Sequence, residues 1–368
     1  MIVGDYPENE NALMLGPTRV TYNLSNELAK LPQTDVTLFK AHRHRHFYKR
    51  TVCLQKQPLV VMKVSRQNLI INLLKQKNDL INISGVSSFN VLPLVVKKLL
   101  KGKLVYLAHD LVSREKHLGY KYPPQMNLYE KLLLKKSDHI IVASQYMKET
   151  VMQDYGVEPQ KITVIHLGVD ENFFKKSDPN LFMNAFNLSN KHLLLFVGAI
   201  KYVKGLDFLL NALRTVNEEC TLVLAGPKTP LLYALEREFH DLFSAKRVKY
   251  VGTLGKEMLL SAYASAEIFV LPSRHEGFGL VALEAMAAGK AIIISDRVRV
   301  SEIIKDGKDG FIVTFGDIET LTLRIEELLA GDKKRIKMGE YAKEKAKEYT
   351  WNRIAEKYLR VYKEIIEE

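Results

Sequence analysis

Short apolar runs alternate along the chain with longer segments in which apolar residues recur every three or four positions. Such runs are typical of buried parallel strands, and the longer segments are typical of the helices that connect them. In the first half, the predicted strands cover residues 1–3, 36–39, 79–83, 103–107, 139–142 and 161–165. The predicted helices cover 19–31, 91–100, 126–136 and 145–155. This alternation predicts an α/β fold built around a parallel sheet.

The same alternation starts again after a polar stretch that contains Asp178 and Pro179. The predicted strands now cover 193–197, 221–225, 248–251, 268–271 and 291–294, and the predicted helices 206–215, 230–242, 258–264 and 280–288. Apolar residues at helical spacing predict a last amphipathic helix at 351–366. We therefore expect two Rossmann-like domains, 1–170 and 191–350, with a linker at 171–190 and a final helix at 351–368. The two parallel sheets are expected to face each other across a cleft, because α/β proteins bind ligands at the carboxyl ends of their strands.

The chain has 368 residues, of which 47% are hydrophobic and 26% charged. These ordinary values exclude a disordered or low-complexity chain. Cys53 and Cys220 lie far apart and in no metal-ligand spacing, which argues against a disulfide framework or a cysteine zinc site and favours a reducing compartment. No stretch approaches the roughly 20 apolar residues that span a bilayer. The run that begins at Met1 lacks the basic start of a signal peptide, so we expect a soluble cytoplasmic protein.

The formal net charge is +12, and most of it lies in the first half of the chain. Residues 1–175 hold 25 Lys and Arg against 15 Asp and Glu, a net +10, which leaves 29 against 27, a net +2, for residues 176–368. A basic half attracts nucleic acid, phosphorylated substrates or an acidic membrane surface, and composition leaves these three open.

A basic run at residues 42–50, HRHRHFYKR, follows the second predicted strand. Its three alternate histidines suggest a metal site, but no carboxylate or cysteine joins them locally, and a solvated loop is the plain alternative. The run also suits a surface that attracts a phosphate-bearing or membrane-bound substrate, as do the basic segments 97–103 and 131–136. Because no nucleic-acid motif accompanies these charges, we expect peripheral contact with an acidic membrane, at the inner face of the cell membrane, and no nucleic acid.

The segment 268–289, IFVLPSRHEGFGLVALEAMAAG, carries the strongest signal for chemistry. A buried strand ends there, and a Gly-Phe-Gly turn at 277–279 then opens a helix. Glycines let a ligand approach the backbone, and the free amides at a helix start favour a phosphate. Glu276 lies before the turn and Glu284 about one turn into the helix, so both carboxylates can accept hydrogen bonds from sugar or ribose hydroxyls. The alternative is an ordinary helix cap with a solvated Glu284.

The ordered set Glu-Gly-Phe-Gly-x4-Glu resembles glycosyltransferase family 4, also described as glycosyl transferases group 1. Members of that family are retaining enzymes with two Rossmann-like domains, an architecture called GT-B. Further parts of the chain resemble family motifs in the same order, namely HD at 109–110, SDHIIVAS at 137–144, KITVIHLGVDENFF at 161–174, FVG at 196–198, KG at 204–205, LAG at 224–226 and VG at 251–252. The resemblance covers most of the chain.

This resemblance implies a retaining glycosyltransferase that moves a hexose from a nucleoside diphosphate sugar to a hydroxyl acceptor. The donor would be a UDP-, GDP- or ADP-sugar, and the acceptor a sugar, a lipid-linked group or a phosphorylated group. The resemblance implies no cofactor and no metal, and no Asp-x-Asp motif stands in a suitable loop. It also implies that the carboxyl domain holds the nucleotide, that the amino domain chooses the acceptor, and that the last helix crosses back to the amino domain.

The transition state of this reaction resembles an oxocarbenium ion leaving a diphosphate that gains negative charge, so the enzyme must place donors around the diphosphate. By resemblance, Lys204 supplies a cation, and Glu276 and Glu284 hold hydroxyls of the transferred sugar and of the ribose. His109 would lie against the donor sugar, with a structural hydrogen-bonding role as the alternative. We expect His109, Lys204 and Glu276 to be catalytic. The expected substrate-binding residues are Gly16, Gly198, Lys201, Lys204, Arg274, Glu276, Gly277, Phe278, Gly279, Leu280 and Glu284.

The chain departs from the family pattern at Ala199, where the family commonly has an arginine that pairs with the later lysine on the diphosphate. Lys201, Arg274 and Arg19 are candidates to replace that arginine. Lys201 stands two residues on, and the alternation of side chains along a strand would point it to the same side. Only Gly16 stands where two adjacent glycines are common.

Three other functions fit parts of this pattern. A nucleotide-sugar epimerase would share the architecture and need no acceptor. A catalytically silent, glycosyltransferase-like binding subunit is favoured by Ala199 and opposed by the retention of Lys204, Glu276 and Glu284. A basic nucleic-acid-binding protein explains only the charge.

Overall fold

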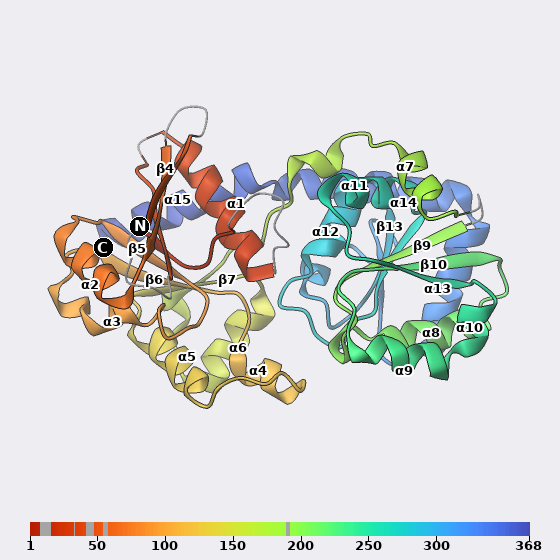
Figure 1. Ribbon diagram of the computed structural model, residues 1–368, viewed down its shortest axis with the longest axis horizontal. Coiled ribbons are helices and arrows are strands. Elements are labelled where there is room, and N and C mark those ends of the chain that lie inside the picture. Colours follow the sequence, from red (N-terminus) through yellow and green to blue (C-terminus); the bar gives the residue numbers. More distant parts are fainter. Residues whose placement is uncertain (8–15, 33, 42–47, 54–57, 189–191) are drawn as a thin grey trace. The chain divides into compact units, whose positions relative to one another are not determined.

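The protein is described by a computed structural model that covers residues 1–368 except 8–15, 33, 42–47, 54–57 and 189–191. It divides into two compact units (Figure 1). Unit 1 contains Met1–Gly168 and Trp351–Glu368, and unit 2 contains Val169–Thr350. The expected linker, 171–190, lies in unit 2 and holds a 3-10 helix η3 (Glu171–Phe174) and helix α7 (Pro179–Ala185).

Unit 1 is built on an eight-stranded sheet with the strand order β3-β4-β2-β1-β5-β6-β7-β8. Every neighbouring pair is parallel except β3 and β4. The strands are β1 (Ile2–Val3), β2 (Thr37–Ala41), β3 (Tyr48–Cys53), β4 (Pro58–Val64), β5 (Leu80–Ser84), β6 (Lys103–Ala108), β7 (His139–Val142) and β8 (Ile162–Val164). The central strands are buried on both faces, as expected for parallel strands between helices.

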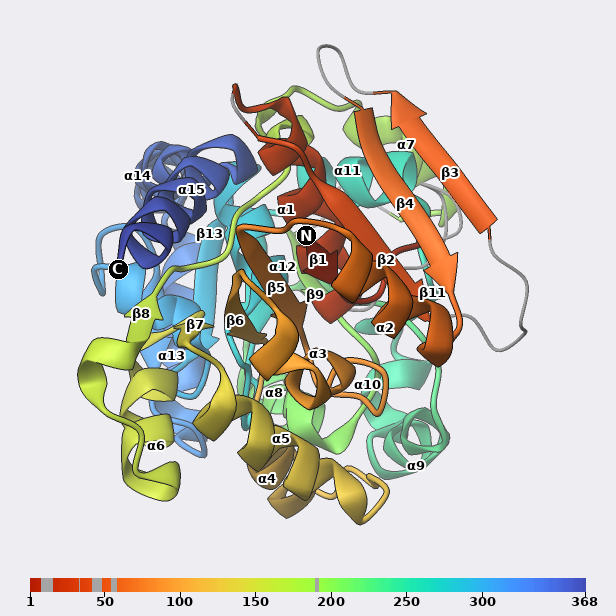
Figure 2. The ribbon, with the colours of Figure 1, turned by 90° about the vertical axis from the view of Figure 1, so that its left-hand side faces the viewer.

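Helices cover both faces of this sheet (Figure 2). They are α1 (Gly16–Lys30), α2 (Arg66–Lys75), α3 (Leu92–Val95), α4 (Val112–His117), α5 (Gln125–Lys136), α6 (Gln145–Tyr155) and α15 (Trp351–Glu367), with 3-10 helices η1 (Lys97–Leu99) and η2 (Pro159–Lys161). Buried leucines of α2 and α5 and apolar residues of α6 share one core with the strands. Helices α1 and α15 pack against each other on the opposite face.

The carboxyl-terminal helix α15 is held in unit 1 by its apolar stripe. Ile354 and Tyr358 are fully buried, and Tyr362 accepts a hydrogen bond from the Asn82 side chain on β5. At the start of the helix, Trp351 packs so closely on Gly168 that a Cβ there would lie 2.6 Å from the indole. The chain therefore returns to unit 1 at a point where only a glycine fits.

Unit 2 has a six-stranded, fully parallel sheet with the order β11-β10-β9-β12-β13-β14. Its strands are β9 (His192–Val197), β10 (Cys220–Ala225), β11 (Val248–Gly252), β12 (Ile268–Leu271), β13 (Ala291–Ser295) and β14 (Phe311–Val313). Its remaining helices are α8 (Leu206–Thr215), α9 (Pro230–Glu238), α10 (His240–Ser244), α11 (Lys256–Ser265), α12 (Leu280–Ala287), α13 (Ile318–Ala330) and α14 (Asp332–Ala346), with 3-10 helices η4 (Tyr202–Lys204), η5 (Arg299–Ile303) and η6 (Lys347–Tyr349).

These two sheets confirm the predicted α/β fold, and the strands predicted from apolar runs lie within two residues of those observed. The hairpin of β3 and β4, helix α2, strand β14 and helices α13 and α14 were not predicted. Reading the run 42–50 as a solvated loop is wrong in part, because residues 48–50 begin β3. Residues 42–47 lie outside the described residues. Among the helices that the structure describes, none has the length and hydropathy needed to cross a membrane.

Candidate functional site

Parallel strands end at one edge of their sheet, and the predicted site residues follow the strands of unit 2 at that edge. Gly205, which precedes α8, has a φ of +67°, and a Cβ there would lie 2.0 Å from the carbonyl oxygen of Pro272. Gly279, which precedes α12, has a φ of +103°, and a Cβ there would lie 2.6 Å from Val298. Both positions therefore require glycine, and both let a helix begin directly against a neighbouring loop.

Lys204 and Glu276 form an ion pair at this edge. Lys204 ends η4, after β9, and Glu276 lies in the loop after β12, so the pair joins the two central loops of the sheet. The Ser273 hydroxyl donates to the same Glu276 oxygen (3.2 Å), and the Glu276 amide donates to the carbonyl of Arg297 (3.3 Å). The two side chains are only 19% and 15% exposed, so the pair is largely screened from water.

Arg274, a candidate to replace the arginine absent at Ala199, is held by the segment that follows β9. Its guanidinium donates two parallel hydrogen bonds to Asp207, at 2.7 and 2.6 Å, and one to the carbonyl of Tyr202 (2.8 Å). It also lies 3.7 Å from the centre of the Tyr202 ring. Burial alone would raise the pKa of Asp207, but these hydrogen bonds hold it below its usual value. Arg274 therefore carries a charge that is already paired.

Of the other two candidates, only Lys201 departs from the local structure expected for it. Strand β9 ends at Val197, so the alternation of a strand does not extend to Lys201, which is exposed and precedes η4. Arg19 lies on α1 in unit 1. Gly198 directly follows β9, and its amide donates to the carbonyl of Ala225 (2.8 Å) at the end of the next strand.

Helix α12 begins at Leu280, after the turn of residues 277–279. Phe278 is buried, and its carbonyl accepts from the Val300 amide (2.7 Å). Glu284, expected to be near the ligand, is only 2% exposed and accepts a hydrogen bond from the fully buried hydroxyl of Tyr263 (3.0 Å). Glu284 is thus no solvated helix residue. Tyr263 carries no sequence signal, because it stands in an ordinary amphipathic segment.

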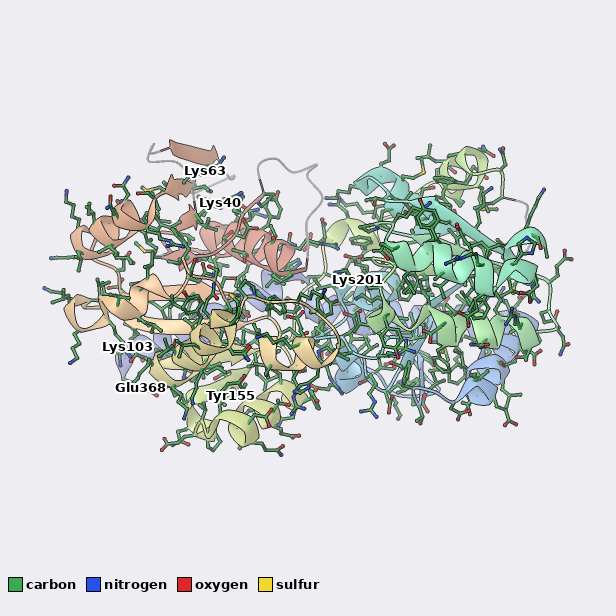
Figure 3. The ribbon with its side chains drawn as sticks, turned by 60° about the horizontal axis from the view of Figure 1, so that its bottom comes forward. Lys40, Lys63, Lys103, Tyr155, Lys201 and Glu368 are labelled. Carbon is green, nitrogen blue, oxygen red and sulfur yellow. The ribbon has the colours of Figure 1, made fainter. Side chains whose placement is uncertain are left out.

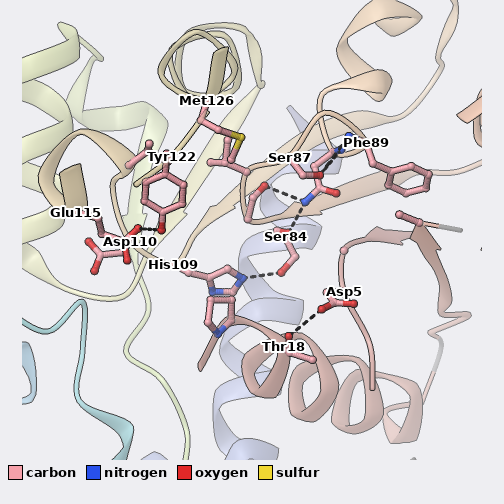
Figure 4. A pocket seen from close by; sticks show the side chains of 17 residues that line it. Asp5, Thr18, Ser84, Ser87, Phe89, His109, Asp110, Glu115, Tyr122 and Met126 are labelled. Atoms are coloured by element: carbon pink, nitrogen blue, oxygen red, sulfur yellow. Dashed lines mark hydrogen bonds between the residues drawn. The ribbon is translucent and has the colours of Figure 1, made fainter. Parts of the chain in front are cut away.

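His109 lies at the carboxyl edge of the unit 1 sheet, after β6, in a cavity of about 450 Å³ (Figure 4). Its Nε2 lies 2.7 Å from the Ser84 hydroxyl, which lies 2.6 Å from the Thr21 hydroxyl. Burial lowers the pKa of His109 to about 4, although Asp110 acts in the opposite direction. The Nδ1 atom is buried and has no hydrogen-bond partner among the described residues. The imidazole is therefore neutral at physiological pH.

Asp110, from the HD motif at 109–110, also lines the cavity, and most of the remaining wall residues were not singled out in the sequence. The wall includes three carboxylates, Asp5 after β1, Asp110 after β6 and Glu115 on α4, together with Tyr122. Position after a strand was an available signal for Asp5, since such loops line ligand sites in α/β folds. Gly16, expected in the site, is the first residue of α1, next to Pro17 and Thr18 of the cavity wall.

The structure therefore groups the expected residues into two sets. Unit 2 holds Gly198, Lys201, Lys204, Arg274, Glu276, Gly277, Phe278, Gly279, Leu280 and Glu284, and unit 1 holds Gly16 and His109. Among the residues that the structure describes, no three His, Cys, Asp or Glu side chains gather as metal ligands would.

Two family models match the chain, one in each unit. The model for glycosyltransferase family 4 matches residues 15–173, and the model for glycosyl transferases group 1 matches residues 180–345. Among curated proteins, an uncharacterized glycosyltransferase of Methanocaldococcus jannaschii is 30% identical over 237 residues, 62% of this chain and 60% of that protein. A D-inositol 3-phosphate glycosyltransferase of Corynebacterium urealyticum is 28% identical over 260 residues, 67% of this chain and 61% of that protein. The chain thus spans about 60% of the length of each of these two relatives.

Solved structures share the fold over almost the whole chain. Sucrose-phosphate synthase of Thermosynechococcus elongatus has a TM-score of 0.80 at 19% identity, covering 99% of this chain and 98% of its own. HepE of Anabaena, solved in complex with UDP and glucose, has a TM-score of 0.77 at 18% identity, covering 99% of this chain and 100% of its own. The two matching models and the two Rossmann-like units show that the chain belongs to the glycosyltransferases of group 1 and family 4, with the GT-B fold.

Proposed function

We propose that the protein transfers a hexose from a nucleoside diphosphate sugar to a hydroxyl acceptor, with retention of the anomeric configuration and without a metal. The observation that carries this proposal is the Lys204–Glu276 ion pair at the carboxyl edge of unit 2, close in sequence to the amino end of α12. One partner suits a phosphate and the other suits sugar hydroxyls, and a nucleotide sugar presents both groups side by side.

The proposed mechanism uses charge that is in place before the reaction starts. As the bond to the anomeric carbon breaks, the diphosphate gains negative charge, which Lys204 and the amides at the start of α12 stabilise. Glu276 is released from Lys204 and accepts hydrogen bonds from the sugar, and Glu284 accepts from the ribose. The leaving phosphate takes the proton of the acceptor hydroxyl, so no side chain has to attack the sugar. The Tyr263 hydroxyl fixes the orientation of Glu284.

His109 is proposed to accept a hydrogen bond from the donor sugar. The Pro17 carbonyl can only accept, so the Thr21 hydroxyl, 3.1 Å away, donates to it. Ser84 then donates to Thr21, and the Nε2–H of His109 donates to Ser84. This chain of hydrogen bonds leaves a lone pair on Nδ1, and a neutral imidazole with that lone pair binds a hydroxyl hydrogen.

The donor nucleotide is proposed to be UDP, GDP or ADP. HepE, which was solved with UDP and glucose, shares the fold and supports a uridine nucleotide among these three. A catalytically silent binding subunit is the second candidate. It is favoured by Ala199 and by the paired state of Arg274, which together leave Lys204 and Lys201 as the cations expected near the diphosphate.

We further propose that unit 1 contacts an anionic membrane through the amino edge of its sheet. Val95 and Leu99 are 73% and 71% exposed there, beside the exposed Lys98 and Lys101. Lys103 begins β6 at this edge (Figure 3). Apolar side chains among lysines suit an acidic lipid surface. The cavity lies at the opposite edge, four to six strand residues away, or roughly 13–20 Å, so this patch anchors the protein and does not feed the cavity.

Donor binding is expected to raise the melting temperature. UDP, GDP, ADP and their common sugar conjugates should be compared by thermal shift, with and without EDTA. A ligand at 100 times its dissociation constant adds about 2.7 kcal/mol to the unfolding free energy. Stabilisation by one nucleotide followed by release of its sugar supports the transferase, and stabilisation without release under any acceptor condition supports the silent subunit.

Loss of the Lys204 charge should slow transfer without unfolding the protein. We expect Lys204→Ala to reduce kcat by at least about 100-fold, because one pre-placed donor at a developing charge contributes on that scale. Glu284→Gln should mainly raise KM for the donor. The exposed Lys333→Ala on α14 is the control, and circular dichroism monitors folding. Normal turnover in Lys204→Ala would contradict the site assignment.

The neutral state of His109 predicts a pH dependence of stability. Its folded pKa, about 4, lies below the ordinary value of 6.5, so the unfolded chain binds the extra proton between these values. Stability therefore rises with pH through this window and is lost as the pH falls from 6.5 toward 4, by up to about 1.4 kcal/mol for each pH unit. Denaturant unfolding at a series of pH values measures the slope of the unfolding free energy against pH. This slope should be shallower in His109→Gln and unchanged in the exposed control His117→Gln.

The membrane proposal predicts salt-sensitive binding to phosphatidylcholine vesicles that contain phosphatidylglycerol, and none to phosphatidylcholine alone. Lys98→Ala with Lys101→Ala should weaken binding by about 30-fold, since each lysine contributes about 1 kcal/mol. The control is Lys333→Ala with Lys337→Ala, both exposed on α14. Equal binding by the two double variants would contradict the proposal.

A further inference from the structure

The cavity of unit 1 has a wall of unusual chemistry for a chain of net charge +12. The described residues that line it include no lysine and no arginine. They include three carboxylates, those of Asp5, Asp110 and Glu115. Lys40 pairs with Asp5 at 3.6 Å but is not part of the wall. A phosphate entering this cavity would meet like charges, which cost energy at short range in a protein environment.

Two hydroxyl donors of the wall are directed to the protein itself. The Thr18 hydroxyl donates to Asp5 (3.0 Å), and the Tyr122 hydroxyl donates to Glu115 (2.5 Å) (Figure 4). The amino end of α1, which would otherwise favour an anion, therefore already has the Asp5 carboxylate beside it. In both pairs the donor is used, and the oxygen atoms that accept belong to carboxylates.

The inner part of the wall follows the same rule. The Asn90 amide donates to the carbonyls of Ser84 (2.7 Å) and Gly85 (3.1 Å), and the Nε2–H of His109 is taken by the Ser84 hydroxyl. Ser87 is the exception, because its hydroxyl accepts from two backbone amides and keeps its own hydrogen. The buried Nδ1 of His109 carries the lone pair that the proposed function gives to the donor sugar.

Backbone amides at the amino end of α4 already donate hydrogen bonds within the protein. The Leu111 amide donates to Asp110 (2.8 Å), and the Val112 amide donates to the buried Glu130 (2.6 Å). An anion-binding loop needs such amides to point at its ligand. Here carboxylates of the protein have taken them.

We propose that the acceptor group which enters this cavity is an unphosphorylated, hydroxyl-rich sugar. The inference rests on the proposed function and narrows its range of acceptors, because it excludes a phosphorylated acceptor. A wall that presents acceptors binds a ligand that brings donors, and sugar hydroxyls bring one each. The apolar side chains of Phe89 and Met126 and the ring of Tyr122 add surface for the C–H face of a sugar. The named relative that uses inositol 3-phosphate would then differ from this chain in its acceptor.

The test compares matched pairs of probes on the full chain. The methyl glycosides of glucose, galactose, mannose and N-acetylglucosamine are each titrated by calorimetry beside the corresponding 6-phosphate, with glucosamine as a cationic arm. We expect at least one neutral glycoside to bind about tenfold more tightly than its phosphate, a difference of 1.4 kcal/mol. The inference is overturned if a phosphate binds more tightly than its neutral glycoside, or if glucosamine alone binds. It is also overturned if no neutral glycoside binds at millimolar concentration.

Variants connect the preference to the wall. Glu115→Gln keeps the shape of the side chain and removes its charge, so the ratio of neutral to phosphorylated binding should fall by about tenfold, or 1.4 kcal/mol. The control Glu149→Gln changes an exposed carboxylate on α6 and should leave the ratio unchanged. An unchanged ratio in both Glu115→Gln and Asp5→Asn, with melting temperatures that show folded protein, contradicts the inference.

Donor assays separate the two hypotheses. If a nucleotide sugar binds and is cleaved while phosphorylated acceptors are preferred, the transferase proposal stands and only this inference fails. If neutral glycosides bind as expected but no nucleotide sugar binds or is cleaved, the description of the cavity stands and the transferase proposal fails.

Discussion

Parallel pairing is the constraint on which the rest of this molecule depends. Because neighbouring strands run the same way, every loop that follows a strand leaves the sheet at one edge, and residues distant in sequence meet there. Lys204 and Glu276 are 72 residues apart and form an ion pair for this reason. The edge is crowded, so the chain can turn only where Gly205 and Gly279 allow backbone to pass within contact of a neighbouring loop. Chemistry at this edge is thus inseparable from the glycines that shape it.

Charge in unit 1 is arranged by the same geometry. Exposed lysines gather before β6 and β7, at the amino edge, while carboxylates follow β1 and β6 at the carboxyl edge. The net charge of the first half therefore says little about the cavity, since the sheet separates the two groups. Net charge is summed over the whole surface of a domain, but a ligand contacts the residues at only one edge of the sheet. This separation is why a basic domain can contain a cavity walled by acceptors.

The fold followed from the sequence because buried parallel strands are continuous apolar runs, as in 103–107 and 291–294. Strand β3 escaped prediction because residues 48–50 belong to a basic run that reads as a loop. Contacts between distant residues were equally hidden. Arg274 looks from the sequence like a loop cation available to a phosphate, and only the fold shows that Asp207 holds it. The glycines and the Glu276–Glu284 spacing could be recognised in the sequence, because they depend on the local geometry of one turn and one helix.

The substitution of alanine at position 199 changes how the proposed donor site must balance charge. Lys204 and Arg274 each have a carboxylate partner, so neither adds net positive charge to this site before a diphosphate arrives. Under the proposed function, Glu276 exchanges Lys204 for sugar hydroxyls, which are neutral donors, and this exchange frees the lysine to face the phosphate. Arg274 has no such exchange, because Asp207 and Tyr202 hold it in three hydrogen bonds. Under the proposed function, the amides at the start of α12, which need no counter-ion and act as about half a positive charge, would carry a larger share of diphosphate binding than in relatives that keep the arginine.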